Sequence, residues 1–314
     1  MKGKTMLTVD AHVHFYDPTR PQGVPWPRGD DQVIYRKMFP ENYRIAAATE
    51  DVAGVVVIEA SSWLEDNQWI LDMAEGETLI WGVIGNLDPA AGEFAENLAR
   101  FGANPLFRGI RVDMGKIKGS DSQLRAGLQL LAANGLVLEV LTRAQDIPAI
   151  LRLVEGLPDL RVILNHLAGV QINGNSPDGN WLAQMRMAAQ YPHVYCKVSR
   201  LLEASTSRPV PRDVKYYAPV LDVVCQLFGE DRLIYGSNWP PCERCAPLAT
   251  VHRLTRTYFS DRGMDAVYKV FGQNALQVYQ LHPRAGDAPV SRTRPEAMPT
   301  VTAQVAARRG QALE

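Results

Sequence analysis

The sequence predicts a (β/α)8 barrel, and three observations support this fold class. Eight short apolar runs, most of them dense in Val, Ile and Leu, recur along the chain. A helix-like stretch follows each run, and the alternation occupies about 255 residues, a common size for this barrel. Most of the runs are continuously apolar and do not alternate with polar residues, which indicates parallel strands buried on both faces.

The expected strands follow one another at regular intervals. In chain order they are Leu7–His12, Val55–Ala60, Leu79–Gly85, Phe107–Val112, Leu136–Leu141, Arg161–Asn165, Val194–Ser199 and Leu233–Gly236. Between them, apolar residues recur at helical spacing. Examples are Trp69, Ile70, Met73 and Ala74, then Leu124, Leu128 and Leu131, then Val220, Val223, Val224 and Leu227. A doubly wound open sheet is the alternative, but no G-x-G-x-x-G follows the first strand, which disfavours its nucleotide-binding version.

The barrel accounts for most of the chain. We expect one domain over residues 1–283 and a flexible carboxyl-terminal tail over residues 284–314, where periodicity is absent. Two long connections, residues 15–41 and 200–213, are rich in Pro and charged residues and are predicted to be loops. Both follow strands, so both should lie at the carboxyl face, where barrel enzymes have their active sites.

Composition excludes several classes of protein. The 314 residues carry 33 Lys and Arg against 34 Asp and Glu, a formal net charge of −1, whereas nucleic-acid-binding proteins usually show a basic excess. No apolar run approaches the roughly 20 residues that cross a bilayer, and no signal-peptide pattern is present. Four cysteines make no disulfide framework. We expect a cytoplasmic protein with a small-molecule substrate and without nucleic-acid or membrane partners, and a homo-oligomer is compatible with this.

Histidines end two of the expected strands. His12 and His14 lie two residues apart in Asp10-Ala-His-Val-His, and side chains at this spacing on a strand point to the same side. Both imidazoles can therefore enter the barrel mouth, as metal ligands or as polar groups. His166 ends the sixth strand in Val-Ile-Leu-Asn-His, again at the functional face.

Charged and amide groups also fall in or beside apolar strands. Glu59 and Glu139 would be costly to bury unless they are paired, bind a metal or act as bases. Arg111 and Lys197 could hold an anionic substrate or could neutralise these two glutamates. Asn238 ends the eighth strand, where it would project into the mouth or bond the adjoining loop.

Tryptophans are frequent in the expected carboxyl-face loops. Trp26, Trp63 and Trp239 could provide flat walls for a sugar ring or could seal the top of the barrel. The Cys242-Glu-Arg-Cys245 pair has no second pair at zinc-site spacing, so we interpret it as reduced thiols.

Seven segments occur along the chain in a fixed order. They are DAHVHFYDP, the second strand with SSWLEDNQWILDMA after it, GNLDP, FRGIRVD, LNHLAG, YCKVSRL and DRLIYGSNWPPCE. Together they resemble the amidohydrolase superfamily, and more narrowly its amidohydrolase-2 branch of metal-dependent hydrolases with a TIM-barrel fold. The resemblance spans residues 7–281. The branch includes lactonases of sugar-acid lactones, pyrone-dicarboxylate lactonase, a galactarolactone isomerase and more distant decarboxylases.

The resemblance implies roles for individual residues. His12 and His14 match the H-x-H of the family, and His166 matches its later strand histidine, so the three, alone or with a glutamate, imply a site for one divalent ion. Mixed nitrogen and oxygen ligation favours zinc or manganese. Asn238 departs from the family, because many members have an aspartate there as ligand and base. An amide is not a base near neutrality, so Glu59, Glu139 or His166 becomes the candidate base.

The leading hypothesis is hydrolysis of a cyclic ester of a small sugar acid or other carboxylate-bearing compound. A metal-bound water would attack the lactone, and Arg111 and Lys197 would hold the substrate carboxylate or stabilise the oxyanion. Three alternatives remain: a metal-free lactonase or lactone isomerase, a metal-dependent non-oxidative decarboxylase, and a binding protein without catalysis. Asn238 is the residue that supports the last of these.

Overall fold

The structure is a computed structural model, and it describes residues 7–113 and 121–284. Eight parallel strands pair in sequence order, β1 with β2 through to β7 with β8, as the sequence predicts. Their bounds are β1 (Thr8–Val13), β2 (Val52–Ile58), β3 (Ile80–Gly85), β4 (Phe107–Asp113), β5 (Val137–Leu141), β6 (Val162–Leu164), β7 (Val194–Val198) and β8 (Leu233–Tyr235). The fold is a (β/α)8 barrel.

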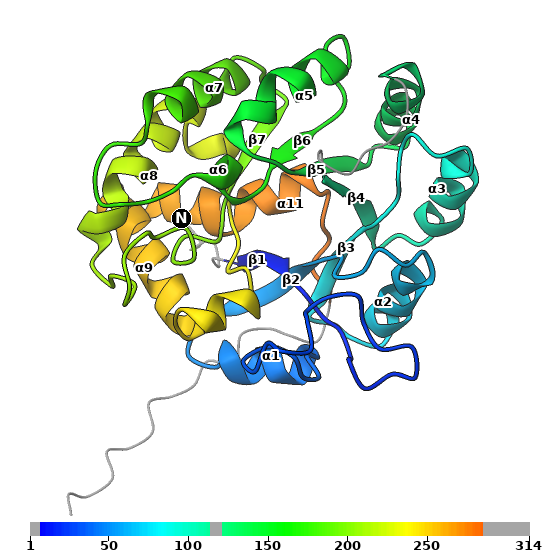
Figure 1. The fold of residues 1–314 in the computed structure, drawn as a ribbon, viewed down its shortest axis with the longest axis horizontal. Helices are drawn as coiled ribbons and strands as arrows, with labels where there is room; N and C mark the ends of the chain where they lie inside the picture. Colours follow the sequence, from blue (N-terminus) through cyan, green and yellow to red (C-terminus); the bar gives the residue numbers. More distant parts are fainter. Residues whose placement is uncertain (1–6, 114–120, 285–314) are drawn as a thin grey trace, which may run out of the picture.

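Helices surround the strands, which lie at the centre of the molecule (Figure 1). The longer helices are α2 (Glu65–Glu75), α3 (Phe94–Gly102), α4 (Asp121–Ala133), α5 (Ile147–Val154), α7 (Gly179–Ala189), α8 (Val214–Phe228) and α9 (Leu248–Asp261). Shorter ones are α1 (Pro40–Ala46), α6 (His166–Gly169), α10 (Met264–Tyr268) and α11 (Asn274–Val278), with η1 (Ala144–Asp146), η2 (Glu230–Arg232), η3 (Pro241–Arg244) and η4 (Lys269–Gln273).

The barrel closes between its first and last strands. The backbone N–H of His14 donates to the carbonyl of Trp239 at 2.9 Å, and the N–H of Asn238 donates to the carbonyl of His12 at 3.0 Å. The buried carboxylate of Asp10 reinforces this seam, since it accepts from the backbone N–H of Ser237 at 2.8 Å and from the Tyr43 hydroxyl at 2.8 Å. The closure sets the first and last strand ends, with their polar residues, side by side.

The second strand differs from its predicted bounds. It begins three residues earlier, at Val52, and ends at Ile58, so Glu59 follows the strand instead of lying within it. Gly54 looks like a strand breaker in sequence, yet it makes the close packing possible: a Cβ there would lie 2.1 Å from the Trp81 ring. A glycine within a strand often marks such a close approach.

The core has an outer and an inner part. The outer part lies between the strands and the helices and contains most of the buried apolar residues. The inner part fills the barrel and includes Val9, Val56, Ile84, Val137, Ile163 and Ile234. Two charged residues, Glu139 and Lys197, are fully buried side chains of β5 and β7. The polar site therefore stands above a closed apolar floor that holds one buried ion pair.

Both long connections form irregular loops, as expected. The first precedes α1 and is fastened to the body of the protein by Arg20, which donates to both carboxylate oxygens of Asp66 on α2 at 2.8 and 2.9 Å. The second precedes α8. The predicted flexible tail lies outside the described residues except for Arg284, which bonds the carbonyls of Ala74 and Glu77.

Among the described residues, no helix combines the length and the apolar character that a bilayer crossing requires. All four cysteines are free, and Cys242 of the C-x-x-C pair is buried.

Candidate active site

A cavity of about 620 Å³ opens at the carboxyl ends of the strands. The end of every strand contributes to its lining, the arrangement that lets barrel enzymes assemble a site from many loops. Each strand end contributes at least one lining residue. In strand order these include His14, Glu59, Asn86, Arg111, Leu141, His166, Arg200 and Asn238.

Three histidines meet at the floor of this cavity. The ring centroids of His12 and His14 lie 5.0 Å apart, and those of His12 and His166 lie 4.5 Å apart. His12 is completely buried, whereas His14 and His166 line the cavity. The i, i+2 spacing on the first strand thus brings both of its imidazoles to the mouth, where the residue after β6 joins them.

Hydrogen bonds orient two of these rings. The Nδ1 of His14 lies 2.9 Å from the carbonyl of Ile58 and 3.2 Å from that of Glu59. Because carbonyl oxygens only accept, His14 carries its proton on Nδ1, which leaves a lone pair on Nε2. The Nδ1 of His166 shares a hydrogen bond of 2.7 Å with the hydroxyl of Ser199, at the end of β7.

All three imidazoles favour the neutral form. Burial is the main cause, and it lowers the pKa of His14 to about 3 and the pKa values of His12 and His166 well below 6.5. The charge of Arg200 lowers the pKa of His166 further. At neutral pH the site therefore presents three uncharged nitrogen bases.

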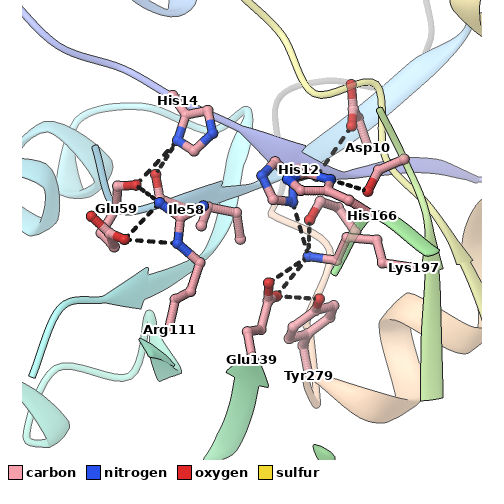
Figure 2. Close-up of polar contacts among 12 residues, drawn as sticks. Asp10, His12, His14, Ile58, Glu59, Arg111, Glu139, His166, Lys197 and Tyr279 are labelled. Atoms are coloured by element: carbon pink, nitrogen blue, oxygen red, sulfur yellow. Dashed lines mark hydrogen bonds and ion pairs between the residues drawn. The ribbon is translucent and has the colours of Figure 1, made fainter. Parts of the chain in front are cut away.

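Glu59 and Arg111 form an ion pair at the cavity wall. The Nε and Nη2 of Arg111 lie 2.7 and 2.6 Å from Oε1 of Glu59, and Nη2 also donates to the Glu59 carbonyl at 2.9 Å. The same carbonyl accepts from His14. The pair is one of the two arrangements that the sequence left open, and Figure 2 shows it beside His14.

Glu139 and Lys197 form a second pair, deeper in the barrel (Figure 2). The Nζ of Lys197 lies 2.7 and 2.8 Å from the two carboxylate oxygens, and the Tyr279 hydroxyl donates to Oε1 at 2.5 Å. Nζ also donates to the carbonyl of Ala11 at 2.8 Å and lies 3.5 Å from Nδ1 of His12. Burial lowers the pKa of Lys197 to about 8 although Glu139 opposes this shift. The pair supports the histidines from below and has no exposed surface.

Asn238 lines the cavity next to β8 and is held by a carboxylate. Its Nδ2 donates to Oε1 of Glu203 at 2.7 Å. Glu203 belongs to the loop after β7, and burial raises the pKa of its carboxyl. The other oxygen of Glu203 is buried and has no hydrogen-bond partner among the described residues.

Left-handed backbone conformations gather at the mouth of the barrel. His166, Leu167 and Ala168 have φ of 55°, 53° and 51°, and Arg200 and Asn238 have φ of 57° and 61°. Such conformations cost about 1–3 kcal/mol each in residues other than glycine and cluster at functional sites. Three cavity-lining side chains, those of His166, Arg200 and Asn238, are aimed by this unusual backbone.

The tryptophans take different positions. Trp26 lines the cavity, with its ring centroid 5.3 Å from that of His14. Trp239 is 1% exposed and packs against Phe15 and Tyr43 below the rim. Trp63 is 38% exposed. Of the three, Trp26 therefore has the best position for a wall against a ligand.

The histidines meet some of the requirements of a metal site. The Nε2 of His12 is buried without a partner, and neutral imidazole is the form that ligates metals. However, within residues 7–113 and 121–284 no three His, Cys, Asp or Glu side chains are grouped closely enough to hold an ion. The site thus offers neutral imidazole nitrogens, but the described side chains, the three histidines included, are not arranged as three ligands of one ion.

Several residues of the site escaped the sequence analysis. Ser199 follows Lys197 at the i+2 spacing that identifies one side of a strand, so the pattern could have indicated it. Arg200, Glu203 and Tyr279 carry no such signal, because a backbone angle, a loop path and a distant helix end bring them to the site.

The family model described as amidohydrolase matches residues 9–281. An L-fucono-1,5-lactonase from Burkholderia ambifaria is 28% identical over 290 residues, which cover 89% of this chain and 97% of the relative. An L-rhamnono-gamma-lactonase from Scheffersomyces stipitis is 22% identical. The match covers 87% of this chain and 98% of the relative.

The barrel also resembles solved structures. An amidohydrolase from Burkholderia multivorans, crystallised with bound zinc, superposes with a TM-score of 0.78 at 24% identity, covering 88% of this chain and all of the other. At this identity the likeness supports the fold, and the family match supports the relationship. The chain belongs to the amidohydrolase family.

Proposed function

We propose that the protein hydrolyses the lactone of a small sugar acid in the cavity at the barrel mouth. The curated relatives include two kinds of sugar-acid lactonase that match nearly their whole length. The observation that carries the proposal is the meeting of three neutral imidazoles at a cavity whose wall also holds Arg111, Asn238 and Trp26. Such a site can activate water and can hold a polyhydroxylated ring.

His166 is the proposed general base. It lines the cavity, and burial keeps its imidazole neutral. Among the other candidates, Glu59 is occupied by Arg111, Glu139 lies in the buried pair with Lys197, and Asn238 has no basic group. Of the two neutral imidazoles that line the cavity, His14 and His166, we assign the role of base to His166, which Ser199 holds at Nδ1.

The reaction then proceeds by addition and elimination. The oxygen of water bonds to the lactone carbonyl carbon while His166 accepts a proton. The tetrahedral oxyanion collapses, the bond from the carbonyl carbon to the ring oxygen breaks, and the ring oxygen takes the proton from His166, which returns the base to its neutral form and gives the open hydroxy acid. Arg111 lies at the cavity wall to stabilise the oxyanion or the carboxylate, and Lys197 contributes from beneath through His12.

A divalent ion, zinc or manganese, is the proposed cofactor. His12 and His14 would hold it through their uncommitted nitrogens. His166 would join them as a third ligand only in a version of the reaction in which it is not the base, because Nε2 is its one nitrogen not bonded to Ser199. When bound, such an ion lowers the pKa of a coordinated water and polarises a carbonyl. The zinc in the related Burkholderia multivorans structure supports this choice.

A metal-free reaction is the second candidate. The described residues group no three metal-binding side chains, and the Lys197 ammonium lies beside Nδ1 of His12, where it favours that nitrogen as an acceptor. In this version the histidines act through hydrogen bonds, and His166 remains the base.

The proposed function is tested with purified protein and a panel of hydroxylated 1,4- and 1,5-lactones. Proton release is followed with a pH indicator, and evolved carbon dioxide is measured in parallel on aromatic carboxylates. Opening of at least one lactone well above the buffer rate supports the proposal. Carbon dioxide release without lactone opening would favour a decarboxylase instead.

A further inference from the structure

The amide of Asn238 is held on both sides. Its backbone N–H donates to the carbonyl of His12 at 3.0 Å, and its φ of 61° turns the side chain to the cavity. Its Nδ2 donates to Oε1 of Glu203 at 2.7 Å. Two segments on either side of the barrel seam thus determine where this amide lies.

The contact with Glu203 also decides which way the amide faces. Because Oε1 of Glu203 accepts the hydrogen bond in this contact, the nitrogen of Asn238 points to Glu203. Its Oδ1 is then the atom that remains for the cavity. Without Glu203, the amide could rotate by half a turn and present a donor in place of an acceptor.

The surroundings of Glu203 are unusual for a side chain with a purely packing role. Its Oε2 is buried and finds no partner in the described part of the chain. A buried polar atom without a hydrogen bond costs roughly 1–3 kcal/mol. Arg200 and Arg244 act on this carboxyl through their charges, and Asn238 is its side-chain hydrogen-bond partner.

We propose that Glu203 is a positioning residue for the reaction, which holds Asn238 so that Oδ1 is a fixed acceptor at the cavity wall. This inference rests on the proposed lactone hydrolysis at the same cavity. In this role Glu203 anchors the amide, and Asn238 presents a neutral acceptor to a hydroxyl of the bound substrate.

The test uses the full chain and a double-mutant cycle. Glu203→Met removes the acceptor and keeps the volume, Glu203→Gln keeps an acceptor oxygen, and Asn238→Ala removes the positioned group. Loss of the hydrogen-bond partner of a metal ligand typically lowers metal affinity or activity about 10- to 100-fold, and we expect a similar range for the partner of a substrate-binding amide. We expect Glu203→Met to lower kcat/KM in this range on a hydroxylated 1,5-lactone, and Glu203→Gln to stay within about 3-fold of wild type.

The decisive comparison is made in the Asn238→Ala background. If Glu203 acts through Asn238, adding Glu203→Met to Asn238→Ala lowers kcat/KM no further. Equal losses with and without Asn238 would overturn the proposal. Glu65→Ala, which removes a surface carboxylate that pairs with Arg100, is the matched control and should leave the rate unchanged.

A structural readout separates this inference from the proposed function. In nitrogen-15 spectra, the side-chain amide of Asn238 is identified by its loss in Asn238→Ala, and its proton signals should move upfield in Glu203→Met. An unmoved amide signal would refute the positioning role even in an active enzyme. A moved signal in a protein that opens no lactone would instead refute the proposed function. If Glu203→Met does not fold, the same shift is measured in Glu203→Gln, where a smaller movement is expected.

Discussion

The ammonium of Lys197 lies 2.7 and 2.8 Å from the two carboxylate oxygens of Glu139, and neither side chain has exposed surface. Removing one member of such a pair leaves a buried charge without its partner, which typically costs 3–5 kcal/mol, whereas replacing both with apolar residues costs much less. The pair therefore stabilises the inner core of the barrel and also holds Lys197 next to His12.

We predict that Glu139→Gln lowers the free energy of unfolding by about 3–5 kcal/mol, measured by urea denaturation. The double variant Glu139→Leu, Lys197→Met should lose less than the sum of the single changes. A Glu139→Gln protein of wild-type stability with a greatly reduced kcat would contradict this, because that result is expected of a catalytic base.

His252 gives a pH-dependent stability. It packs between Tyr235 and Phe271 with 1% exposure, and burial lowers its pKa to about 3. Between pH 6.5 and pH 3 the unfolded chain binds a proton at this position and the folded protein does not, so stability falls as the pH falls. From pH 6.5 to 5 this one residue should remove about 2 kcal/mol from the free energy of unfolding.

The check compares wild type with His252→Asn in urea at pH 6.5 and pH 5. Other buried histidines contribute to both proteins, so the difference between their changes in unfolding free energy from pH 6.5 to pH 5 isolates His252. The variant should lose less unfolding free energy over this pH range than wild type. Equal losses in the two proteins would contradict the assignment.

Arg111 is predicted to bind substrate in a geometry that lysine cannot reproduce. Its guanidinium contacts Oε1 of Glu59 through Nε and Nη2 at the same time. The single ammonium of a lysine cannot place two donors in this planar arrangement. We expect Arg111→Lys to raise KM about 10-fold with a smaller change in kcat, in steady-state assays on the best lactone. Arg100→Lys changes a similar two-pronged pair on the surface and should leave both constants unchanged.

The proposed metal ion gives a fourth prediction. Wild-type protein should contain about one zinc or manganese per chain by plasma mass spectrometry. His12→Ala and His14→Ala should each reduce this content substantially, because each removes a nitrogen ligand. Full activity after exhaustive chelation, with no metal detected, would favour the metal-free reaction.

The sequence was sufficient for the architecture because buried parallel strands leave a strong apolar pattern. The order of all eight strands followed from that pattern, and so did the carboxyl-face location of His14 and His166. The bounds of β2 were wrong by three residues at its start, because Gly54 resembles a strand breaker until the ring of Trp81 is known to pack on it.

The partners within the site could not be predicted in the same way. Sequence placed Glu59, Glu139, Arg111 and Lys197 on strands but contained no distances, so ion pairing and a functional role both remained open. Glu203 was missed because its position depends on the path of an irregular loop. The left-handed backbone at Asn238 is likewise set by the contacts that close the barrel.

The most direct test of the central claim compares His166 with a histidine outside the cavity. Wild type, His166→Asn and His193→Asn are assayed on the best lactone, with circular dichroism to verify folding. The account predicts that His166→Asn loses at least about 100-fold in kcat/KM, as expected for a general base, while His193→Asn keeps the wild-type rate. A folded His166→Asn protein that opens the lactone within about 2-fold of the wild-type rate would contradict the account.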